Sequence, residues 1–198
     1  MSEHYDIISG AERQINVRLL QRGDLAALID MHRQLSTQTL AMRYLVPRQP
    51  SMEELAQVCA LNDMGRGGAF VAVAADEIVA IAYYVRVGWR AAEPAVVVAD
   101  SFQRQGIGRQ LLGYLLEHAL RHGIRTFTTV VYPENRAVLG LIRASGLPYE
   151  MAPSRGARLV NVCLTDVDRD RLIRVASEAS ARAANPAIES TSLVAEER

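Results

Sequence analysis

The residues best suited to chemistry in this chain form a short glycine-containing loop at positions 103–108. Its members are Gln103, Arg104, Gln105, Gly106, Ile107 and Gly108. The apolar run at 94–98 predicts a buried strand before the loop, and leucines at helical spacing predict a helix after it. Glycines let a ligand approach the backbone, and the first amides of a helix carry the positive end of its dipole. The loop therefore predicts a binding site for a phosphate-bearing molecule.

The spacing of the glycines excludes other phosphate-binding motifs. A dinucleotide fingerprint needs a third glycine where Leu111 stands, and a P-loop needs Lys and then Ser or Thr where Tyr114 and Leu115 follow Gly113. A kinase loop needs later metal-binding motifs, and none is visible in the sequence. What remains is the pattern Gln/Arg-x-x-Gly-x-Gly/Ala between a strand and a helix.

This pattern resembles motif A of the GNAT superfamily of acyl-CoA-dependent N-acyltransferases, in which the loop holds the pyrophosphate of coenzyme A. The run 96–98 matches the strand that pairs with the pantetheine arm, and Asn135 followed by residues 144–147 resembles the second motif. The resemblance extends from about Val17 to about Thr165. It implies an α/β (α+β mixed sheet) fold in which two neighbouring strands splay apart and helices flank the sheet.

The same resemblance implies acetyl-CoA as cosubstrate and no metal. The expected cofactor-binding residues are Val96, Val97, Val98, Gln103, Arg104, Gln105, Gly106, Ile107, Gly108, Arg109 and Asn135. Arg104 and Arg109 are candidates to pair with phosphates, with a solvated helix start as the alternative. Asn135 is expected to cap its helix or to bind the pantetheine arm. His118 and His122 have a spacing that can bind metal, but we interpret them as solvated residues near a helix end.

A narrower likeness, to the catalytic domain of bacterial Pat-type protein lysine acetyltransferases, is carried by residues 35–39, Arg43-Tyr44 and residues 92–98. It implies that Glu93 is the general base. A lysine-type amine has a pKa of about 10.4 and must lose a proton before it attacks. Burial would have to raise the pKa of Glu93 for this task. The alternative, an exposed carboxylate at a strand start, stays open.

The other catalytic groups are less clear from the residues. The resemblance implies that the backbone N–H of Val97 or Val98 stabilises the oxyanion. Many superfamily members place a tyrosine seven residues after the position of Asn135 to protonate the departing thiolate, but Ile142 stands there. The substitutes are Tyr83, Tyr84 and Tyr132. Departure of the thiolate without a dedicated acid is the remaining possibility.

Composition limits the expected cellular location and the expected classes of binding partner. The chain has 198 residues, of which 49% are hydrophobic, and 22 basic residues balance 22 acidic ones. The zero net charge disfavours a nucleic-acid or acidic-membrane partner. Cys59 and Cys163 form no spaced cluster, apolar runs are too short to span a membrane, and residues 1–14 contain no signal-peptide core. We expect a cytoplasmic protein, as a monomer or a homodimer.

The remaining elements follow from periodicity and turn residues. We expect a flexible leader at 1–14, an N-acetyltransferase domain at 15–165 and a charged helical or disordered tail at 166–198. Expected strands lie at 15–20, 69–75, 78–85, 93–98, 124–132 and 158–164, with helices starting near 24, 51, 106 and 135. The stretches 37–50 and 146–157 are expected to be loops that build the acceptor site.

We therefore expect an enzyme that moves an acetyl group from acetyl-CoA to a primary amine by direct attack, with Glu93 as base. A protein lysine is favoured as acceptor. Two alternatives remain: a small-amine or antibiotic N-acetyltransferase, and a non-catalytic acyl-CoA-sensing module.

Overall fold

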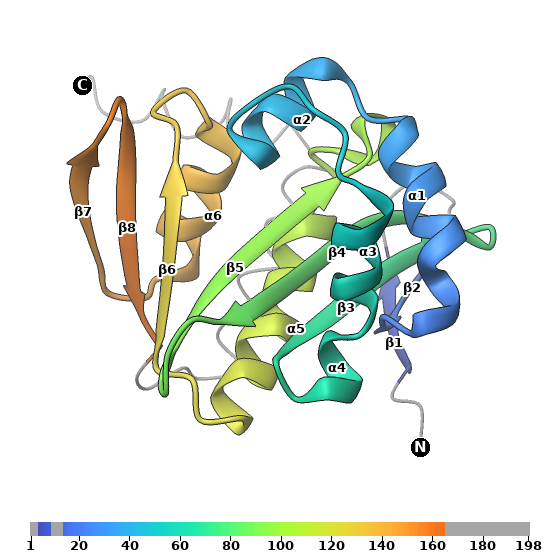
Figure 1. The fold of residues 1–198 in the computed structure, drawn as a ribbon, viewed down its shortest axis with the longest axis horizontal. Coiled ribbons are helices and arrows are strands. Elements are labelled where there is room, and N and C mark those ends of the chain that lie inside the picture. Colours follow the sequence, from blue (N-terminus) through green and yellow to red (C-terminus); the bar gives the residue numbers. More distant parts are fainter. Residues whose placement is uncertain (1–3, 9–13, 165–198) are drawn as a thin grey trace, which may run out of the picture.

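The computed structural model describes residues 4–8 and 14–164, and the expected tail at 166–198 lies outside them. Within these residues, eight strands form one sheet in the order β1-β2-β3-β4-β5-β6-β8-β7 (Figure 1). The strands are β1 (His4–Ile8), β2 (Gln14–Leu19), β3 (Gly67–Ala74), β4 (Glu77–Arg86), β5 (Ala91–Val98), β6 (Thr126–Val131), β7 (Tyr149–Ser154) and β8 (Ala157–Cys163). The helices are η1 (Arg22–Asp24), α1 (Leu25–Arg33), α2 (Thr37–Tyr44), α3 (Met52–Cys59), α4 (Leu61–Met64), η2 (Asp100–Phe102), α5 (Ile107–Arg121) and α6 (Arg136–Ser145).

The pair β5–β6 interrupts an otherwise antiparallel sheet. These strands are parallel and pair only where Ala91 meets Thr126 and Ala92 meets Phe127. Beyond that point the two strands no longer pair with each other, and Figure 1 shows them diverging toward their C-terminal ends. The expected splayed pair in a mixed sheet is confirmed.

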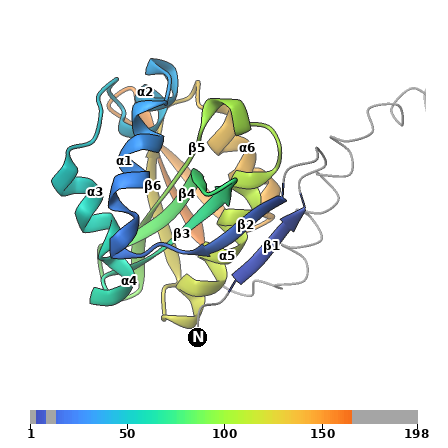
Figure 2. The same cartoon turned by 90° about the vertical axis from the view of Figure 1, so that its right-hand side faces the viewer.

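Helices cover both faces of the sheet (Figure 2). On one face, α5 and α6 bury an apolar cluster that includes Leu111, Leu115 and Leu139. On the other, α1, α2 and α3 bury a second cluster that includes Leu28 and Leu55. The helical spacing of apolar residues in α5 therefore has the expected cause, a stripe that faces the sheet.

Three segments differ from expectation. Residues 1–14, expected as a loose leader, contain β1, which pairs antiparallel with β2. The expected loop 37–50 begins with α2, whose first turn is capped by Ser36 through a bond from the Thr39 N–H of 3.2 Å. The expected loop 146–157 contains β7, paired with β8. Each is a short element without a long periodic pattern; β1 and β7 are stabilised by pairing with the strand that follows, and α2 by its cap.

Candidate active site

The loop between β5 and α5 has an unusual backbone. Arg104 and Gly106 have φ of 61° and 83°, in the left-handed region, and Gly106 directly precedes α5. Side chains cap α2, α3 and α6, but α5, the longest described helix, begins without a side-chain cap. Among the described residues, the backbone N–H groups of Gly106, Ile107 and Gly108 have no hydrogen-bond acceptor. Such a cluster of donors at a positive helix end suits an anion.

The second glycine serves a different purpose. A Cβ added to Gly108 would lie 3.4 Å from Cγ2 of Val98 and 3.8 Å from Cγ2 of Val96. The first turn of α5 therefore lies directly against the end of β5. Gly106 supplies the left-handed turn, whereas a Cβ at Gly108 would make only an ordinary van der Waals contact with β5.

The two arginines of the motif point to different partners. Arg104 is exposed and has no hydrogen bond or ion pair among the described residues, so its charge is available to a ligand. Arg109 donates from Nη2 to the carbonyl of Ala144, at 3.2 Å, near the C-terminal end of α6. This contact satisfies a carbonyl of the last turn of α6.

Asp100 joins the loop to α2. Its carboxylate accepts hydrogen bonds from the backbone N–H of Ser36 at 2.9 Å, from the Ser36 hydroxyl at 2.7 Å and from the Thr39 hydroxyl at 2.8 Å. Partial burial alone raises the pKa of the Asp100 carboxyl, but the bonds from Ser36 and Thr39 outweigh it and hold the pKa below its usual value. Gln103 adds a bond of 3.0 Å from Nε2 to the Thr39 hydroxyl. The start of α2 is thus fixed to the glycine loop.

The other end of α2 is fixed to the start of α6. Asn135 caps α6 by accepting the Val138 N–H at 3.1 Å, and its Nδ2 donates to the Met42 carbonyl at 3.4 Å. The Tyr132 hydroxyl donates to the Leu45 carbonyl at 2.7 Å. Capping, one of the two expected roles of Asn135, is confirmed. Figure 1 shows α2 beside the diverging ends of β5 and β6.

The edge of β5 toward β6 carries unpaired backbone groups. Ala99 donates its N–H to Val79 in β4 at 2.8 Å, and backbone groups of successive strand residues alternate in direction. The N–H of Val97 therefore also points to β4, in the ladder. The N–H groups of Val96 and Val98 point to the side where β6 has diverged. Val98, rather than Val97, is thus the expected donor with access to the gap between the strands.

Glu93 lies on the same face of β5 as Val97, toward α1 and α3. Its side chain is exposed, and among the described residues it has no ion pair or hydrogen bond. The burial expected for a general base is therefore absent among the described residues.

The three candidate tyrosines lie in different places. Tyr84 is fully buried on the α5 side, with its hydroxyl 3.1 Å from Nδ1 of His118. Tyr132 uses its hydroxyl to hold α2. Tyr83 alone of the three lies on the face that carries Glu93. Ile142, at the position where the resemblance places a tyrosine, is buried in the core beside α5.

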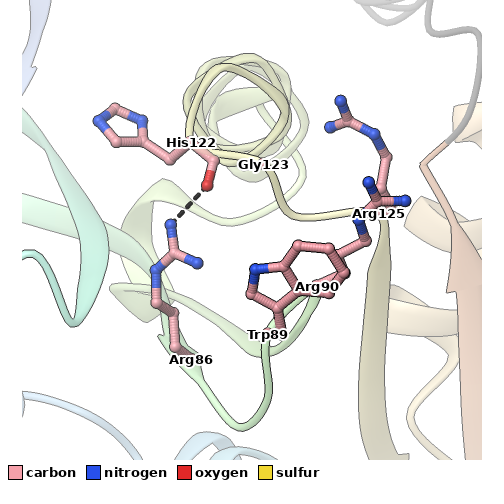
Figure 3. A pocket seen from close by; sticks show the side chains of 6 residues that line it. All are labelled: Arg86, Trp89, Arg90, His122, Gly123 and Arg125. Carbon is pink, nitrogen blue, oxygen red and sulfur yellow. Dashed lines mark hydrogen bonds between the residues drawn. The ribbon is translucent and has the colours of Figure 1, made fainter.

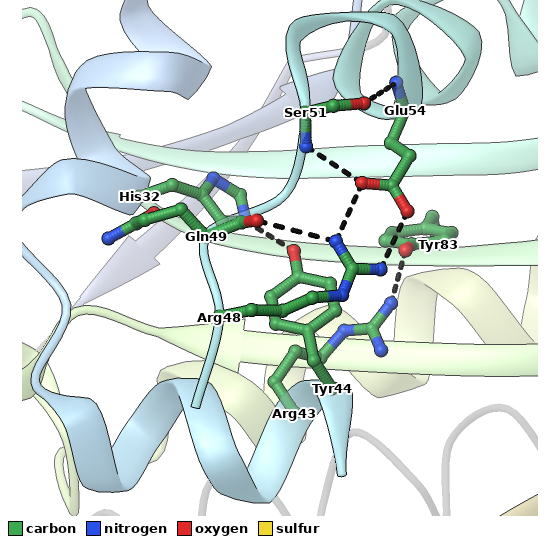
Figure 4. Close-up of polar contacts among 8 residues, drawn as sticks. All are labelled: His32, Arg43, Tyr44, Arg48, Gln49, Ser51, Glu54 and Tyr83. Atoms are coloured by element: carbon green, nitrogen blue, oxygen red, sulfur yellow. Dashed lines mark hydrogen bonds and ion pairs between the residues drawn. The ribbon is translucent and has the colours of Figure 1, made fainter. Parts of the chain in front are cut away.

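The same face of the sheet carries a polar cluster that the sequence did not reveal as a unit (Figure 4). Its members are His32, Arg43, Tyr44, Arg48, Gln49, Ser51, Glu54 and Tyr83. His32 is buried, and its Nδ1 donates to the Leu28 carbonyl at 2.8 Å, so its Nε2 accepts from the Tyr44 hydroxyl at 3.0 Å. Burial lowers the pKa of His32 and raises the pKa of Tyr44 to about 12. Both groups therefore stay neutral near pH 7. Their only sequence signals are the apolar setting of His32 and the Arg43-Tyr44 pair.

A cavity of about 360 Å³ lies at the opposite end of β5, around the C-terminal end of α5 (Figure 3). It is lined by Arg86, Trp89, Arg90, His122, Gly123 and Arg125. Arg86 donates to the carbonyl of His122, and Arg125 donates to the carbonyl of Leu120 at 3.1 Å. These arginines satisfy the last carbonyls of α5, so we interpret the cavity as part of the helix end and not as the cofactor site.

Residues 4–8 and 14–164 contain neither a metal-binding cluster nor a membrane-spanning helix. No group of three or more His, Cys, Asp or Glu side chains there is arranged to hold a metal ion. No helix in this part of the chain has the length and apolar character needed to cross a membrane.

The family follows from comparison with known proteins. The model of the acetyltransferase (GNAT) family matches residues 32–147, which include α2 to α6 and the glycine loop. The chain belongs to this family, and the predicted class of acyl-CoA-dependent N-acetyltransferase is confirmed. No curated protein sequence matches the chain.

Solved structures share the fold. The GNAT domain of the PAT protein of S. lividans is 21% identical and superposes with a TM-score of 0.74 over 81% of this chain and 96% of that domain. The yncA protein of Salmonella typhimurium, solved with its cofactor acetyl-CoA, is 17% identical and superposes with a TM-score of 0.63 over 77% of this chain and 95% of yncA. RimL, a ribosomal L7/L12 alpha-N-protein acetyltransferase solved with coenzyme A, is 20% identical and superposes with a TM-score of 0.63 over 83% of this chain and 100% of RimL. The predicted GNAT-type fold is confirmed.

Proposed function

We propose that this protein transfers an acetyl group from acetyl-CoA to a primary amine, with a protein lysine favoured over small amines. One observation carries the proposal: the uncapped start of α5, with unpaired N–H groups at 106–108, lies against the unpaired edge of β5. The two features match the two halves of coenzyme A, a diphosphate and an extended amide-containing arm.

The donor would bind along these features. The diphosphate accepts hydrogen bonds from the N–H groups of Gly106, Ile107 and Gly108, and the exposed Arg104 adds a positive charge. The pantetheine amides pair with the backbone of Val96 and Val98 as an added strand would. The gap left by β6 gives the arm its room.

The chemistry then needs few further groups. The amine nitrogen attacks the thioester carbonyl carbon, and the N–H of Val96, which like that of Val98 points into the gap but lies nearer to Glu93, stabilises the negative charge that develops on the carbonyl oxygen. The C–S bond breaks and coenzyme A leaves as a thiolate. The proton lost by the amine passes to Glu93, directly or through a water, and from there to solvent. Because Glu93 is exposed, an intervening water has access to it.

Three further points complete the proposal. A protein lysine as acceptor is supported by the Pat-like segments of the sequence. Cytoplasmic location is supported by the cysteine usage, because Cys59 and Cys163 form no spaced cluster, which suits a reducing compartment. We also propose that residues 15–165 form the catalytic domain, acting as a monomer or a homodimer.

The test replaces Glu93 by Gln and measures thiol release from acetyl-CoA with a panel of amines. We expect kcat to fall about 10²–10³-fold, in the range typical of a lost general base. Calorimetry should show coenzyme A affinity within about twofold of wild type, because the loop is untouched. Glu77→Gln, at the exposed start of β4, is the matched control and should leave both values unchanged. A full rate in E93Q would remove Glu93 from the mechanism.

The sensing-module alternative has its own support, namely the exposure of Glu93 and the isoleucine at position 142. It predicts binding of acetyl-CoA without thiol release for every acceptor. The panel should contain lysine peptides, polyamines and aminoglycosides, so that it also separates a protein acceptor from a small amine or an antibiotic. Release only with aminoglycosides would replace the favoured acceptor class.

A further inference from the structure

Arg43, in the last turn of α2, lies over β4 on the face of the sheet that carries Glu93 (Figure 4). Its Nη2 donates to the hydroxyl of Tyr83. Its guanidinium carbon is 4.7 Å from the ring centroid of Tyr44 and 5.2 Å from that of Tyr83. Two aromatic rings therefore hold a cation in a half-buried position.

The charge of Arg43 is not neutralised within the described residues. Ion pairs there involve Arg18, Arg22, Arg33, Arg48 and Arg121, and each of these has a carboxylate partner. Arg43 has none, and its Nε is shielded from solvent without a hydrogen-bond acceptor. A half-buried cation with an unused donor costs free energy in the absence of an anion.

The carboxylate of the same cluster is already occupied. Glu54 accepts two bonds from Arg48, at 2.8 and 2.7 Å, and one from the Ser51 N–H at 2.7 Å. Hydrogen bonds from Arg48 and Ser51 lower the pKa of Glu54 to about 2. Glu54 is therefore held as the partner of Arg48, and its charge is balanced before Arg43 is considered.

Arg43 is also close to the proposed reaction centre. Tyr83 lies opposite Ala95, and Glu93 lies two residues earlier on the same face of β5. Diagonal same-face positions of this kind are about 7–8 Å apart. An anion bound at Arg43 would thus lie within a few bonds of an amine or acyl group at Glu93.

We propose that Arg43 binds a carboxylate carried by one of the two substrates, and so selects for it. The inference rests on the proposed function and narrows its substrate class. Guanidinium groups are the usual partners of carboxylates because they offer several N–H donors in a fixed plane. The carboxylate has two sources: an acidic group beside the acceptor amine, or a dicarboxylic acyl group such as succinyl on the donor.

The test uses two capped peptides of equal length, each with one lysine, flanked by aspartates in one and by asparagines in the other. The acceptor arm compares kcat/KM for the two peptides with acetyl-CoA. The donor arm compares succinyl-CoA with acetyl-CoA on the asparagine peptide. We expect wild type to prefer the carboxylate-bearing member by about 10- to 100-fold in one arm, and Arg43→Gln to reduce that preference to below about twofold.

Arg33→Gln is the control, because Arg33 is exposed and its carboxylate partner is Asp30 rather than Glu54. The R33Q preference should equal that of wild type, and R43K, which keeps the charge without the fork, should be intermediate. A thermal melt of each variant excludes loss of folding as the cause.

Two results would overturn the inference. One is a wild type without a preference in either arm, and the other is an R43Q variant that keeps the wild-type preference. Calorimetric titration of the same peptides and thioesters measures the same preferences without chemistry. A wild type that binds the carboxylate-bearing member more tightly through Arg43, yet releases no thiol, would refute the proposed function and leave this inference standing.

Discussion

Replacing each motif glycine by alanine tests the loop geometry most directly. In Gly106→Ala the new Cβ meets nothing closer than Nε2 of Gln110 at 4.0 Å, so the cost is the left-handed φ of 83° alone. A residue with a Cβ pays about 1–2 kcal/mol in that region. In Gly108→Ala the φ is not positive, and the Cβ contact of 3.4 Å with Val98 is ordinary van der Waals distance.

Comparing the two variants isolates this strain. Both gain the same roughly 0.4–1 kcal/mol from a stiffer unfolded chain, so that contribution cancels. G106A should therefore be about 1–2 kcal/mol less stable than G108A, a Tm difference of about 2–8 °C for a chain of this size. Differential scanning calorimetry measures it.

Coenzyme A affinity gives the functional half of the prediction. In G106A, relief of the strain at residue 106 should rotate the peptide plane that follows it. The N–H groups of residues 107 and 108 would then point in a different direction. Loss of one charge-assisted hydrogen bond should raise the Kd for coenzyme A about 10-fold or more, whereas G108A should stay within about threefold. If G106A binds coenzyme A as wild type does, or if both variants lose affinity equally, the amides of this loop do not bind the diphosphate.

Two other predictions concern the fixation of α2 and α6. Asp100→Asn should lower Tm at pH 7, because the carboxylate that binds Ser36 is stabilising when it is charged. The pKa of Asp100 is lowered in the folded state. The stabilisation is therefore present above the unfolded pKa of about 3.9 and is lost as the pH falls through the folded pKa. The Tm difference between wild type and D100N should therefore narrow below about pH 4, and a constant difference would contradict the assignment. Asn135→Ala should cost about 0.5–2 kcal/mol in urea unfolding through loss of the cap on Val138, whereas Asn135→Ser, whose hydroxyl oxygen can also cap, should keep the cap and lose only the bond to the Met42 carbonyl. Equal losses in both variants would show that the cap contributes little.

Local chemistry made part of this site predictable. Glycine at 106 reflects a left-handed turn, a constraint that acts on the residue itself. Asn135 was recognisable as a cap because capping involves residues three apart. The helix start expected near residue 51 is set by a capping box of Ser51 and Glu54, which are also three residues apart.

Long-range contacts account for what the sequence did not predict. Helix α2 is held through Asp100, which is 64 residues from Ser36 and 61 from Thr39. The exposure of Glu93 depends on which elements cover β5, and no pattern within the strand records that. The Val97 N–H was a candidate oxyanion donor until the register with β4 showed its direction.

Because both ends of α2 are tied down, the helix acts as a rigid link between the two halves of the catalytic centre. If a diphosphate at the loop shifts Gln103, we expect its bond to Thr39 to carry the displacement into α2, toward Arg43 and the carbonyl held by Asn135. Such mechanical linkage favours a compulsory order of addition, with the thioester first and the amine second. In steady-state terms, product inhibition by coenzyme A should be competitive against acetyl-CoA and noncompetitive against the amine.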